Sequence, residues 1–203
     1  MIVSNLVLAS ASPRRRELLT LAGFQFEVRS RPVEEVRAQG EAPRDYVTRL
    51  AQAKAAAAYE NPAEIVLGAD TTVVLDDRIL EKPNHAASAK AMLRALSCRE
   101  HIVLTGICLK HHTKTIVDCE STRVSFVALD EQEIADYVAS GEPMDKAGAY
   151  AIQGLASKFV DRIEGCYFNV MGLPLAMFYR HLKNVGQAGS LRPIGNRPTG
   201  SPR

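Results

Sequence analysis

Apolar and polar residues follow two different periods along this chain, which predicts helices mixed with strands. Short apolar runs and alternation of period two are typical of strands, whereas apolar residues three and four positions apart are typical of helices. The predicted strands are Asn5–Ser10, Phe24–Val28, Glu64–Leu67, Thr72–Asp76, Arg78–Leu80, Ile102–Leu109, Thr115–Val127 and Phe159–Ile163. The predicted helices are Pro13–Ala22, Pro43–Tyr59, Ala86–Leu96, Asp130–Ser140 and Leu173–Asn184. We therefore expect a mixed α/β fold.

Local signals mark several ends of these elements. Ser12 is suited to the N-cap of the first helix, and Pro13 to its first helical position. Asp130 is suited to the N-cap of a later helix, and the pair Asp76 and Asp77 to the turn of a hairpin. These residues predict where the helices begin and where one strand reverses direction.

Composition favours one domain with a hydrophobic core. The chain has 203 residues, of which 46% are hydrophobic, and this is sufficient for a single core. We expect one domain over residues 1–185. Residues 186–203 are rich in Gly and Pro with few large apolar side chains, so we expect a disordered tail there.

Composition also disfavours several classes of protein. No apolar run approaches the roughly 18–20 residues that span a bilayer, and the first residues lack the basic start of a signal peptide. The four cysteines show no metal-binding spacing, which favours reduced thiols in a cytoplasmic protein. The net charge is +2, but three arginines lie in the acid-free tail. The rest of the chain is therefore close to neutral, which disfavours nucleic-acid binding.

The segment Ser10–Arg16 joins a strand end to a basic helix start. Arg14 and Arg15 lie where the helix dipole disfavours cations, by some tenths of a kcal/mol each. Such a local exception indicates that an anion is bound there. Serine hydroxyls, helix N–H groups and guanidinium groups together can form a phosphate cradle. The alternative is an ordinary basic turn at the protein surface.

Asp70 follows directly on the predicted strand Glu64–Leu67, in the sequence Gly-Ala-Asp-Thr-Thr. Ligands of open α/β sheets bind at such strand ends. A carboxylate in this position can hold a divalent cation or orient a water molecule for attack. The alternative is an aspartate that forms a turn at the edge of a hairpin.

Four further candidates are weaker on their own. Lys82 follows the hairpin and is either a phosphate ligand or a solvated turn residue. Lys54 lies in a predicted helix, where most lysines are solvated, and Glu35 belongs to an ordinary acidic pair. Gln153 lies in a Gly-rich segment that can approach a ligand closely, and its carboxamide can read a base edge. Residues 169–175 are interpreted as helix entry and core.

In series, four segments resemble the Maf family of nucleoside triphosphate pyrophosphatases: LASASPRRRELL, GADTTVVLDDRILEKP, DKAGAYAIQG and NVMGLPL. The resemblance covers about Leu6–Leu182. It implies an α/β fold with a mixed twisted sheet, flanking helices and two lobes around a deep cleft, similar to inosine triphosphate pyrophosphatases. It also implies hydrolysis of a nucleotide between its α- and β-phosphates with a divalent cation, namely magnesium, manganese or cobalt.

The resemblance also assigns roles to the candidates. Asp70 aligns with the residue proposed as catalytic base, and Glu35 with an acidic metal-site position, although base and metal ligand are not separated between them. The phosphate-contacting positions of the family correspond to Ser10, Arg14, Arg15, Lys54 and Lys82. This set is coherent, because cations stabilise charge on the transferring phosphoryl group and on its leaving group. Two carboxylates can hold the metal and activate a water.

Three positions of the resemblance bear on the base. Subfamilies that resemble the 7-methyl-GTP enzyme carry Trp, Gln and Glu where this chain has Arg14, Thr71 and Gln153. The resemblance therefore implies the dTTP/UTP branch, with modified pyrimidine nucleotides as further substrates. A glutamine can pair with both an N3–H donor and a carbonyl of uracil or thymine. A guanine edge that offers only donors would prefer a carboxylate.

Two alternatives stay open. One is a pyrophosphatase of the same family that prefers 7-methyl-GTP or another nucleotide. The other is a nucleotide-binding regulator of cell division, which the family's association with septum formation implies and which would not need Asp70. A homodimer is a family expectation that no apolar stripe in this sequence supports.

Overall fold

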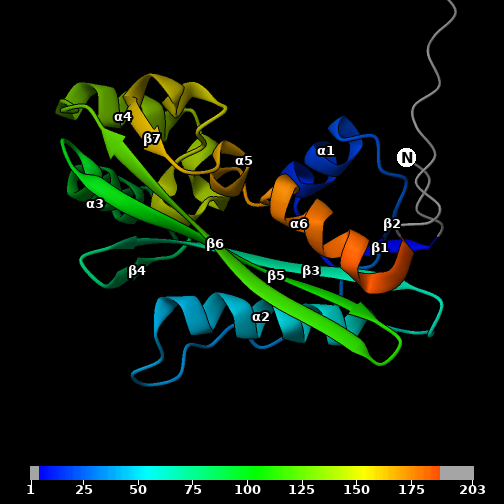
Figure 1. Ribbon diagram of the computed structural model, residues 1–203. Helices are drawn as coiled ribbons and strands as arrows, with labels where there is room; N and C mark the ends of the chain where they lie inside the picture. Colours follow the sequence, from blue (N-terminus) through cyan, green and yellow to red (C-terminus); the bar gives the residue numbers. More distant parts are fainter. Residues whose placement is uncertain (1–4, 188–203) are drawn as a thin grey trace, which may run out of the picture.

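The computed structural model describes residues 5–187 and, within them, one mixed sheet of seven strands (Figure 1). The strand order is β2-β1-β3-β5-β6-β7, and β4 pairs with β3. The strands are β1 (Leu6–Leu8), β2 (Glu27–Val28), β3 (Ile65–Leu75), β4 (Arg78–Leu80), β5 (Glu100–His111), β6 (Lys114–Phe126) and β7 (Val160–Glu164). The helices are α1 (Pro13–Leu21), α2 (Pro43–Ala58), α3 (Ala86–Leu96), α4 (Glu131–Ala139), α5 (Tyr167–Val170) and α6 (Leu175–Leu182). Shorter turns are η1 (Glu142–Asp145), η2 (Ala147–Ala149), η3 (Leu155–Phe159) and η4 (Lys183–Gln187).

Two lobes share the long central strands. β5 is antiparallel to both β3 and β6, whereas β1 runs parallel to both β2 and β3. One lobe has α2 on one face of the sheet and α1 with α6 on the other, and the second lobe contains α3, α4 and β7 (Figure 1). The α/β fold with two lobes is therefore confirmed. Within residues 5–187, none of the helices has the length and apolar character that a membrane span requires.

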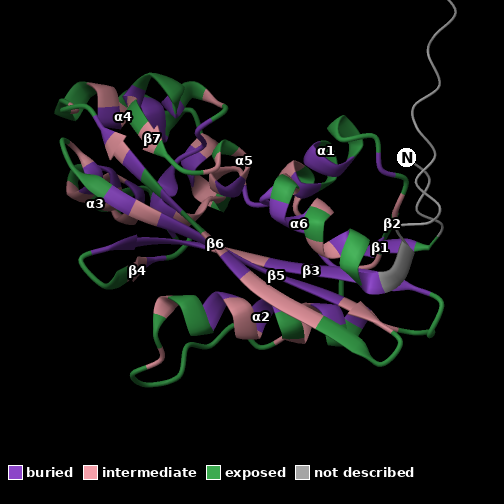
Figure 2. Ribbon diagram, in the orientation of Figure 1, coloured by how far each residue is buried: buried purple, intermediate pink, exposed green. Residues whose placement is uncertain are grey.

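Alternating side chains of β1 and β3 build the core of the first lobe. Leu8 and Leu67 pack among residues of α1 and α6, whereas Val7 and Val66 pack against α2 on the opposite face. This alternation follows from the two-residue period of a strand. A separate core around Leu93 fills the second lobe. Figure 2 shows buried residues running along β3 and β5, which carry both cores.

The sequence prediction was wrong about β3. A strand was expected to end at Leu67 and a second one to start at Thr72, but β3 runs without interruption from Ile65 to Leu75. β5 pairs with it from Val66 to Val74, so the cross-strand ladder continues through the Gly-Ala-Asp segment. Tertiary pairing outweighs the low strand propensity of glycine and aspartate. Asp70 therefore lies within a strand and not in a turn.

The other predicted boundaries are confirmed in part. The hairpin turn at Asp76 and Asp77 is confirmed, since both residues have positive φ, and Asp130 caps α4 through its side chain. Ser12 occupies the N-cap position of α1 but makes no side-chain cap bond. The short helix α5 was not predicted, because four residues carry no period. Residues 188–203 lie outside the described residues, so the expected tail 186–203 stays a prediction.

One edge of β3 is covered at both ends but open in the middle. β1 pairs with it at Ile65–Leu67, and β4 pairs with it at Val73–Leu75. Between them, residues 68–72 have no strand partner on this edge among the described residues, while β5 occupies the opposite edge. Asp70 and Thr71 therefore lie where side chains from both faces of the sheet can reach one opening.

The core of the second lobe contains a buried histidine. His101 is 2% exposed, and its ring lies edge-on to the rings of Phe126 and Tyr150. The Nε2 atom of His101 is 2.8 Å from the hydroxyl of Tyr150, and its Nδ1 atom has no partner among the described residues. Burial lowers the pKa of His101 to about 4, so this side chain is neutral in the folded protein at neutral pH.

We predict that Gly68→Ala destabilises the fold by about 1–3 kcal/mol through overpacking. A Cβ atom at Gly68 would lie 2.1 Å from the Ala51 carbonyl oxygen, and backbone of α2 cannot move aside as a flexible side chain could. Ser121→Thr, which adds one carbon at an exposed position of β6, is the control and should stay within about 0.5 kcal/mol. Denaturant unfolding measures both. Wild-type stability of Gly68→Ala would contradict the close packing of α2 on β3.

We also predict that His101 makes the protein less stable in acid. The unfolded chain protonates this histidine near its ordinary pKa and the folded chain only near 4, so stability falls as pH drops from about 6.5 toward 4. The loss should reach about 2 kcal/mol at pH 5. His101→Gln should remove this part of the pH dependence, whereas the exposed control His112→Asn should keep it. Equal pH profiles of all three proteins would refute the assignment.

Candidate active site

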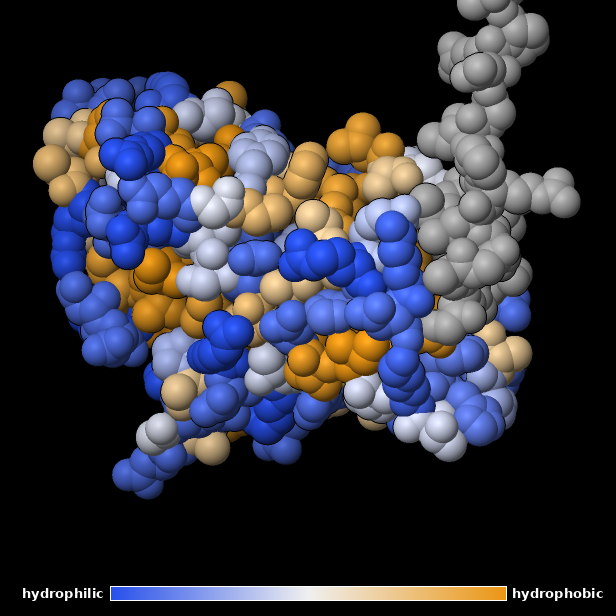
Figure 3. All heavy atoms as spheres, viewed as in Figure 1, coloured by the Kyte–Doolittle hydropathy of each residue, from blue (hydrophilic) through white to orange (hydrophobic). Residues whose placement is uncertain are grey.

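Two adjoining cavities open at the uncovered edge of β3. The larger has a volume of about 530 Å³ and is lined by residues that follow β1, by residues 30–33 and by Lys54 of α2. The smaller, about 100 Å³, lies toward the second lobe. Figure 3 shows the molecule from the side of β6, where hydrophilic residues gather in the middle between apolar patches of the two lobes. The residues that line both cavities are Ser12, Arg14, Arg15 and Lys82.

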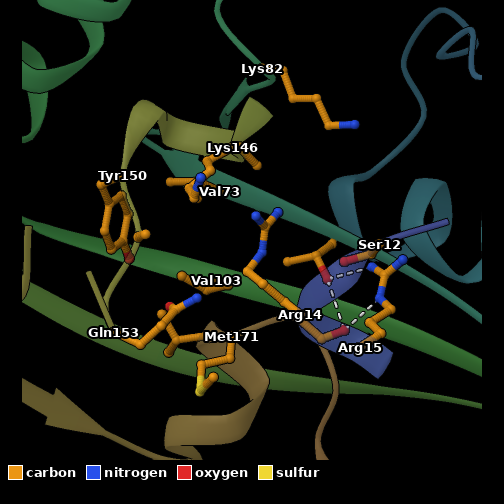
Figure 4. A pocket seen from close by; sticks show the side chains of 15 residues that line it. Ser12, Arg14, Arg15, Val73, Lys82, Val103, Lys146, Tyr150, Gln153 and Met171 are labelled. Carbon is orange, nitrogen blue, oxygen red and sulfur yellow. Dashed lines mark hydrogen bonds between the residues drawn. The ribbon is translucent and has the colours of Figure 1, made fainter. Parts of the chain in front are cut away.

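Arg15 is a buried cation at the junction of the cavities, only 8% exposed. Its Nε donates to the carbonyl of Gly172 at 2.8 Å, as Figure 4 shows. Its Nη1 donates to Ser10 Oγ at 2.9 Å, and its Nη2 to Thr71 Oγ1 at 3.0 Å. Burial lowers the pKa of Arg15 and the charge of Asp70 partly offsets this, yet a guanidinium stays protonated in proteins.

Local sequence explains why this arginine turns inward. The first turn of α1 contains no acidic residue, and Ser12 leaves the helix start without a side-chain cap. Gly172 has φ +106, a conformation that favours glycine, and this directs its carbonyl toward Arg15. Three of the five N–H groups of Arg15 are thus bound by the protein, and the remaining two are available at the cavity.

Lys54 lies between two carboxylates. Its Nζ is 2.7 Å from Asp70 Oδ1 and 2.6 Å from Glu35 Oε1. The side chains of Lys54 and Asp70 are 15% and 13% exposed, whereas that of Glu35 is half-exposed. Partial burial favours the neutral acid at Glu35, but the hydrogen bond and charge of Lys54 hold the pKa of Glu35 below its ordinary value. Three predicted site residues therefore form one charged cluster.

Positive charge dominates the larger cavity, with five basic residues and two acidic residues on its lining. Both acids are engaged, because Glu35 pairs with Lys54 and Asp145 pairs with Arg14 at 3.1 Å. Within residues 5–187, neither Arg15 nor Lys82 forms an ion pair. This excess of cationic groups favours a polyanionic ligand.

The smaller cavity combines apolar walls with a few polar groups. Val73, Val103 and Met171 supply apolar surface, and Tyr150 closes one side. In Figure 4, Arg14 extends into this cavity from one side while Tyr150 and Gln153 lie on the other. A small apolar chamber with polar groups at its rim is suited to a flat ring with hydrogen-bonding edges.

Most predicted site residues meet at these cavities. The larger cavity is lined by Ser10, Arg14, Arg15, Glu35, Lys54 and Lys82, and the smaller by Thr71 and Gln153. Asp70 lies beside the larger cavity and contacts it through Lys54. Two of these side chains already have partners within the protein and are not free to contact a substrate directly. The hydroxyl of Thr71 is engaged by Arg15 and by Thr105, and Arg14 is paired with Asp145.

Sequence reasoning missed several residues of this region. Asp145 was quoted only as part of a motif, and its pairing with Arg14 joins residues 131 positions apart, which no local pattern indicates. Tyr150 and Met171 resemble ordinary core residues in sequence, and only the cavity reveals them. Asn169 was interpreted only as part of a helix entry and core, and Thr105 was not considered, although both are hydrogen-bonded in the chain that leads to Arg15.

Three comparisons place the chain among known proteins. A family model described as Maf-like protein matches residues 5–185. The chain is 52% identical over 182 residues to the dTTP/UTP pyrophosphatase of Koribacter versatilis, covering 89% of this chain and 94% of that protein. It is 48% identical over 185 residues to the dTTP/UTP pyrophosphatase of a Geobacillus species, covering 91% and 100%.

A solved structure, the Ham1 protein of Staphylococcus aureus, superimposes with a TM-score of 0.52 at 13% sequence identity. The match covers 90% of this chain and 100% of that one, and it bears on the fold alone. The family model and the relatives bear on more, because they extend over most of the chain, and the family model spans every residue of both cavities. This chain belongs to the Maf family.

Proposed function

We propose that this protein hydrolyses dTTP and UTP to the nucleoside monophosphate and pyrophosphate. The observation that carries the proposal is the ammonium of Lys54 between the carboxylates of Asp70 and Glu35, beside a cavity with a cationic lining. Relatives about 50% identical over most of the chain carry the name of this activity. The family model spans the residues that build the cluster.

The cationic side chains would bind and orient the triphosphate. Such a group carries about four negative charges, and among residues 5–187 Arg15 and Lys82 have no carboxylate ion-pair partner to compete with it. Arg14 would exchange Asp145 for phosphate oxygens. Preorganised cations lower the barrier because negative charge grows on the leaving pyrophosphate in the transition state.

The carboxylates would act on the attacking water. Asp70 is the better candidate for the proton acceptor, because it lies within β3 and is less exposed than Glu35. In the absence of substrate, the single positive charge of Lys54 is shared between both acids. When a triphosphate binds, Lys54 can turn one N–H group to a phosphate oxygen, since an ammonium has three donors.

The site also suits a divalent cation. Glu35 and Asp70 both present oxygens to one point, which are the ligands that magnesium and manganese prefer. Among residues 5–187 no group of three or more His, Cys, Asp or Glu side chains could hold a metal. Magnesium commonly uses one or two carboxylates together with substrate phosphates, so this pair fits. The bound cation would polarise the α-phosphate and neutralise part of its charge.

The smaller cavity would receive the base. Its Gln153 carboxamide can donate to a carbonyl and accept from N3–H, as uracil and thymine require. Its volume of about 100 Å³ favours a single pyrimidine ring over a substituted purine. Thr71 would act on selectivity through Arg15, because its hydroxyl is already bonded to that side chain.

We predict that the protein releases pyrophosphate from dTTP and UTP with magnesium or manganese, and that Asp70→Asn lowers kcat at least about a hundredfold. The expected loss follows from removal of the proton acceptor. CTP, GTP and 7-methyl-GTP complete the substrate panel, and product release is measured for each. Asp161→Asn on β7, an exposed acid far from the cavities, is the matched control and should keep full activity.

Each outcome of this panel is informative. Preference for 7-methyl-GTP would contradict the assigned base but not the chemistry. Absence of turnover with every nucleotide would overturn the proposed function and favour a nucleotide-binding regulator. An active Asp70→Asn protein would move the role of proton acceptor to Glu35.

We further predict that Glu35→Gln weakens Mn²⁺ binding at least about tenfold in the presence of α,β-methylene-UTP. The amide retains the size of the side chain but loses the charge that attracts the cation. Loss of the electron paramagnetic resonance signal of unbound Mn²⁺ measures binding without requiring turnover. Glu34→Gln changes the neighbouring exposed acid and should bind Mn²⁺ normally. Equal affinity in both variants would exclude Glu35 as a ligand.

A further inference from the structure

A chain of hydrogen bonds runs from Arg15 across the sheet to the segment before α6. Arg15 Nη2 is 3.0 Å from Thr71 Oγ1, which is 2.9 Å from Thr105 Oγ1 on the neighbouring strand β5. Thr105 Oγ1 in turn donates to the backbone carbonyl of Asn169 at 3.1 Å. The chain therefore joins α1, β3, β5 and α5 through consecutive polar contacts.

The chemistry of its two ends fixes the direction of this chain. A guanidinium can only donate and a carbonyl oxygen can only accept. Because Thr105 donates its single proton to the Asn169 carbonyl, the proton between the two hydroxyls comes from Thr71. The other acceptor of the Thr71 hydroxyl, the Gly172 carbonyl, is farther away at 3.5 Å. Thr71 is then an obligatory acceptor for Arg15. Such one-way chains strengthen each member by mutual polarisation.

The far end of the chain is anchored in the core. Thr105, Thr122 and Asn169 are all 0% exposed. The Asn169 side-chain amide donates to the Val103 carbonyl at 3.0 Å and to Thr122 Oγ1 at 2.9 Å. Thr122 Oγ1 donates to the Cys166 carbonyl at 3.1 Å and accepts from the Cys166 N–H at 3.0 Å. This framework holds the Asn169 carbonyl in place.

Neither Thr105 nor Asn169 lines either cavity, so neither can touch a ligand bound there. Burial of three polar side chains costs free energy unless all are hydrogen-bonded. The chain of hydrogen bonds supplies most of the partners that these buried side chains need. It ends at Arg15, whose remaining N–H groups reach the cavity. Its geometry therefore bears on the orientation of those donors.

We propose that Thr105 and Asn169 are positioning residues that orient the Arg15 guanidinium toward the phosphates of the substrate. Thr71 transmits their effect, because it holds Nη2 and leaves the other N–H of that nitrogen directed at the cavity. The inference rests on the proposed function insofar as the ligand is a nucleoside triphosphate. It requires only that a polyphosphate binds at Arg15.

The test compares variants of Thr105 that differ in the hydroxyl. Thr105→Val preserves the shape and removes the proton donor, and Thr105→Ser restores the hydroxyl. Inorganic triphosphate is the probe, and calorimetry measures its dissociation constant. Thr105→Val should weaken binding by about three- to tenfold, the effect of one net hydrogen bond, and Thr105→Ser should stay within about twofold of wild type. If Thr105→Val does not fold, Thr105→Ala replaces it.

Two controls separate positioning from general destabilisation. Ile107→Val removes one buried carbon from the same strand and leaves the chain of hydrogen bonds unchanged. It should therefore lower thermal stability and leave triphosphate binding unchanged. Thr105→Val is also made in an Arg15→Lys background. The lysine keeps a positive charge at this position but lacks the guanidinium group that Thr71 binds. There it should weaken binding by less than about twofold, because the oriented group is gone.

Two results would overturn the proposal. One is a full additional loss of triphosphate binding by Thr105→Val in the Arg15→Lys background. The other is equal binding by Thr105→Val and Thr105→Ser. Both results are measured by triphosphate binding and depend neither on turnover nor on the nucleobase. Failure of this proposal is therefore distinguishable from failure of the proposed function. A protein that binds triphosphate as expected but hydrolyses no nucleotide would leave the positioning role intact and refute only the reaction.

Discussion

The buried guanidinium of Arg15 is bound by a hydroxyl that follows β1, a hydroxyl within β3 and a carbonyl that precedes α6. A charge in the interior is costly unless its donors are satisfied, so these three segments must keep their relative positions. One side chain thereby links parts of the chain more than 150 residues apart. The polar chain behind Thr71 continues to the core at Asn169, so consecutive hydrogen bonds connect the guanidinium of Arg15 to the sheet.

Around this fixed charge the other cations are held less firmly. Lys54 is paired with two carboxylates and Arg14 with one, whereas Lys82 has no such partner in residues 5–187. In the proposed function, a triphosphate would replace carboxylates at the outer cations and add to the bonds of Arg15. Partial burial raises the pKa of Glu35, but the hydrogen bond and charge of Lys54 hold it below its ordinary value. In the proposed function, the neighbouring cations would offset the repulsion between the carboxylates and a polyanion.

The open edge of β3 explains why the site lies between the lobes. β1 ends at Leu8 and β4 begins only opposite Leu75, so the middle of β3 has β5 on one side and the cavities on the other. Close contact of Gly68 and Gly106 with the backbone of α2 brings Lys54 to this opening. The second lobe adds Tyr150 and Gln153, which lie across the cavity from Arg14 (Figure 4).

The sequence by itself determined the types of most elements and the hairpin at Asp76 and Asp77, because periodicity and turn chemistry are local properties. Lys54, Glu35 and Lys82 were weak candidates on their own, and the resemblance to a family made them predicted site residues. The sequence did not show that β3 runs through Asp70, since that depends on pairing with β5. Nor did it show that Lys54 lies between Asp70 and Glu35, or that Asn169 supports Arg15. Only the tertiary structure decided these contacts, because the partners of a buried charge come from segments whose relative placement no local pattern encodes.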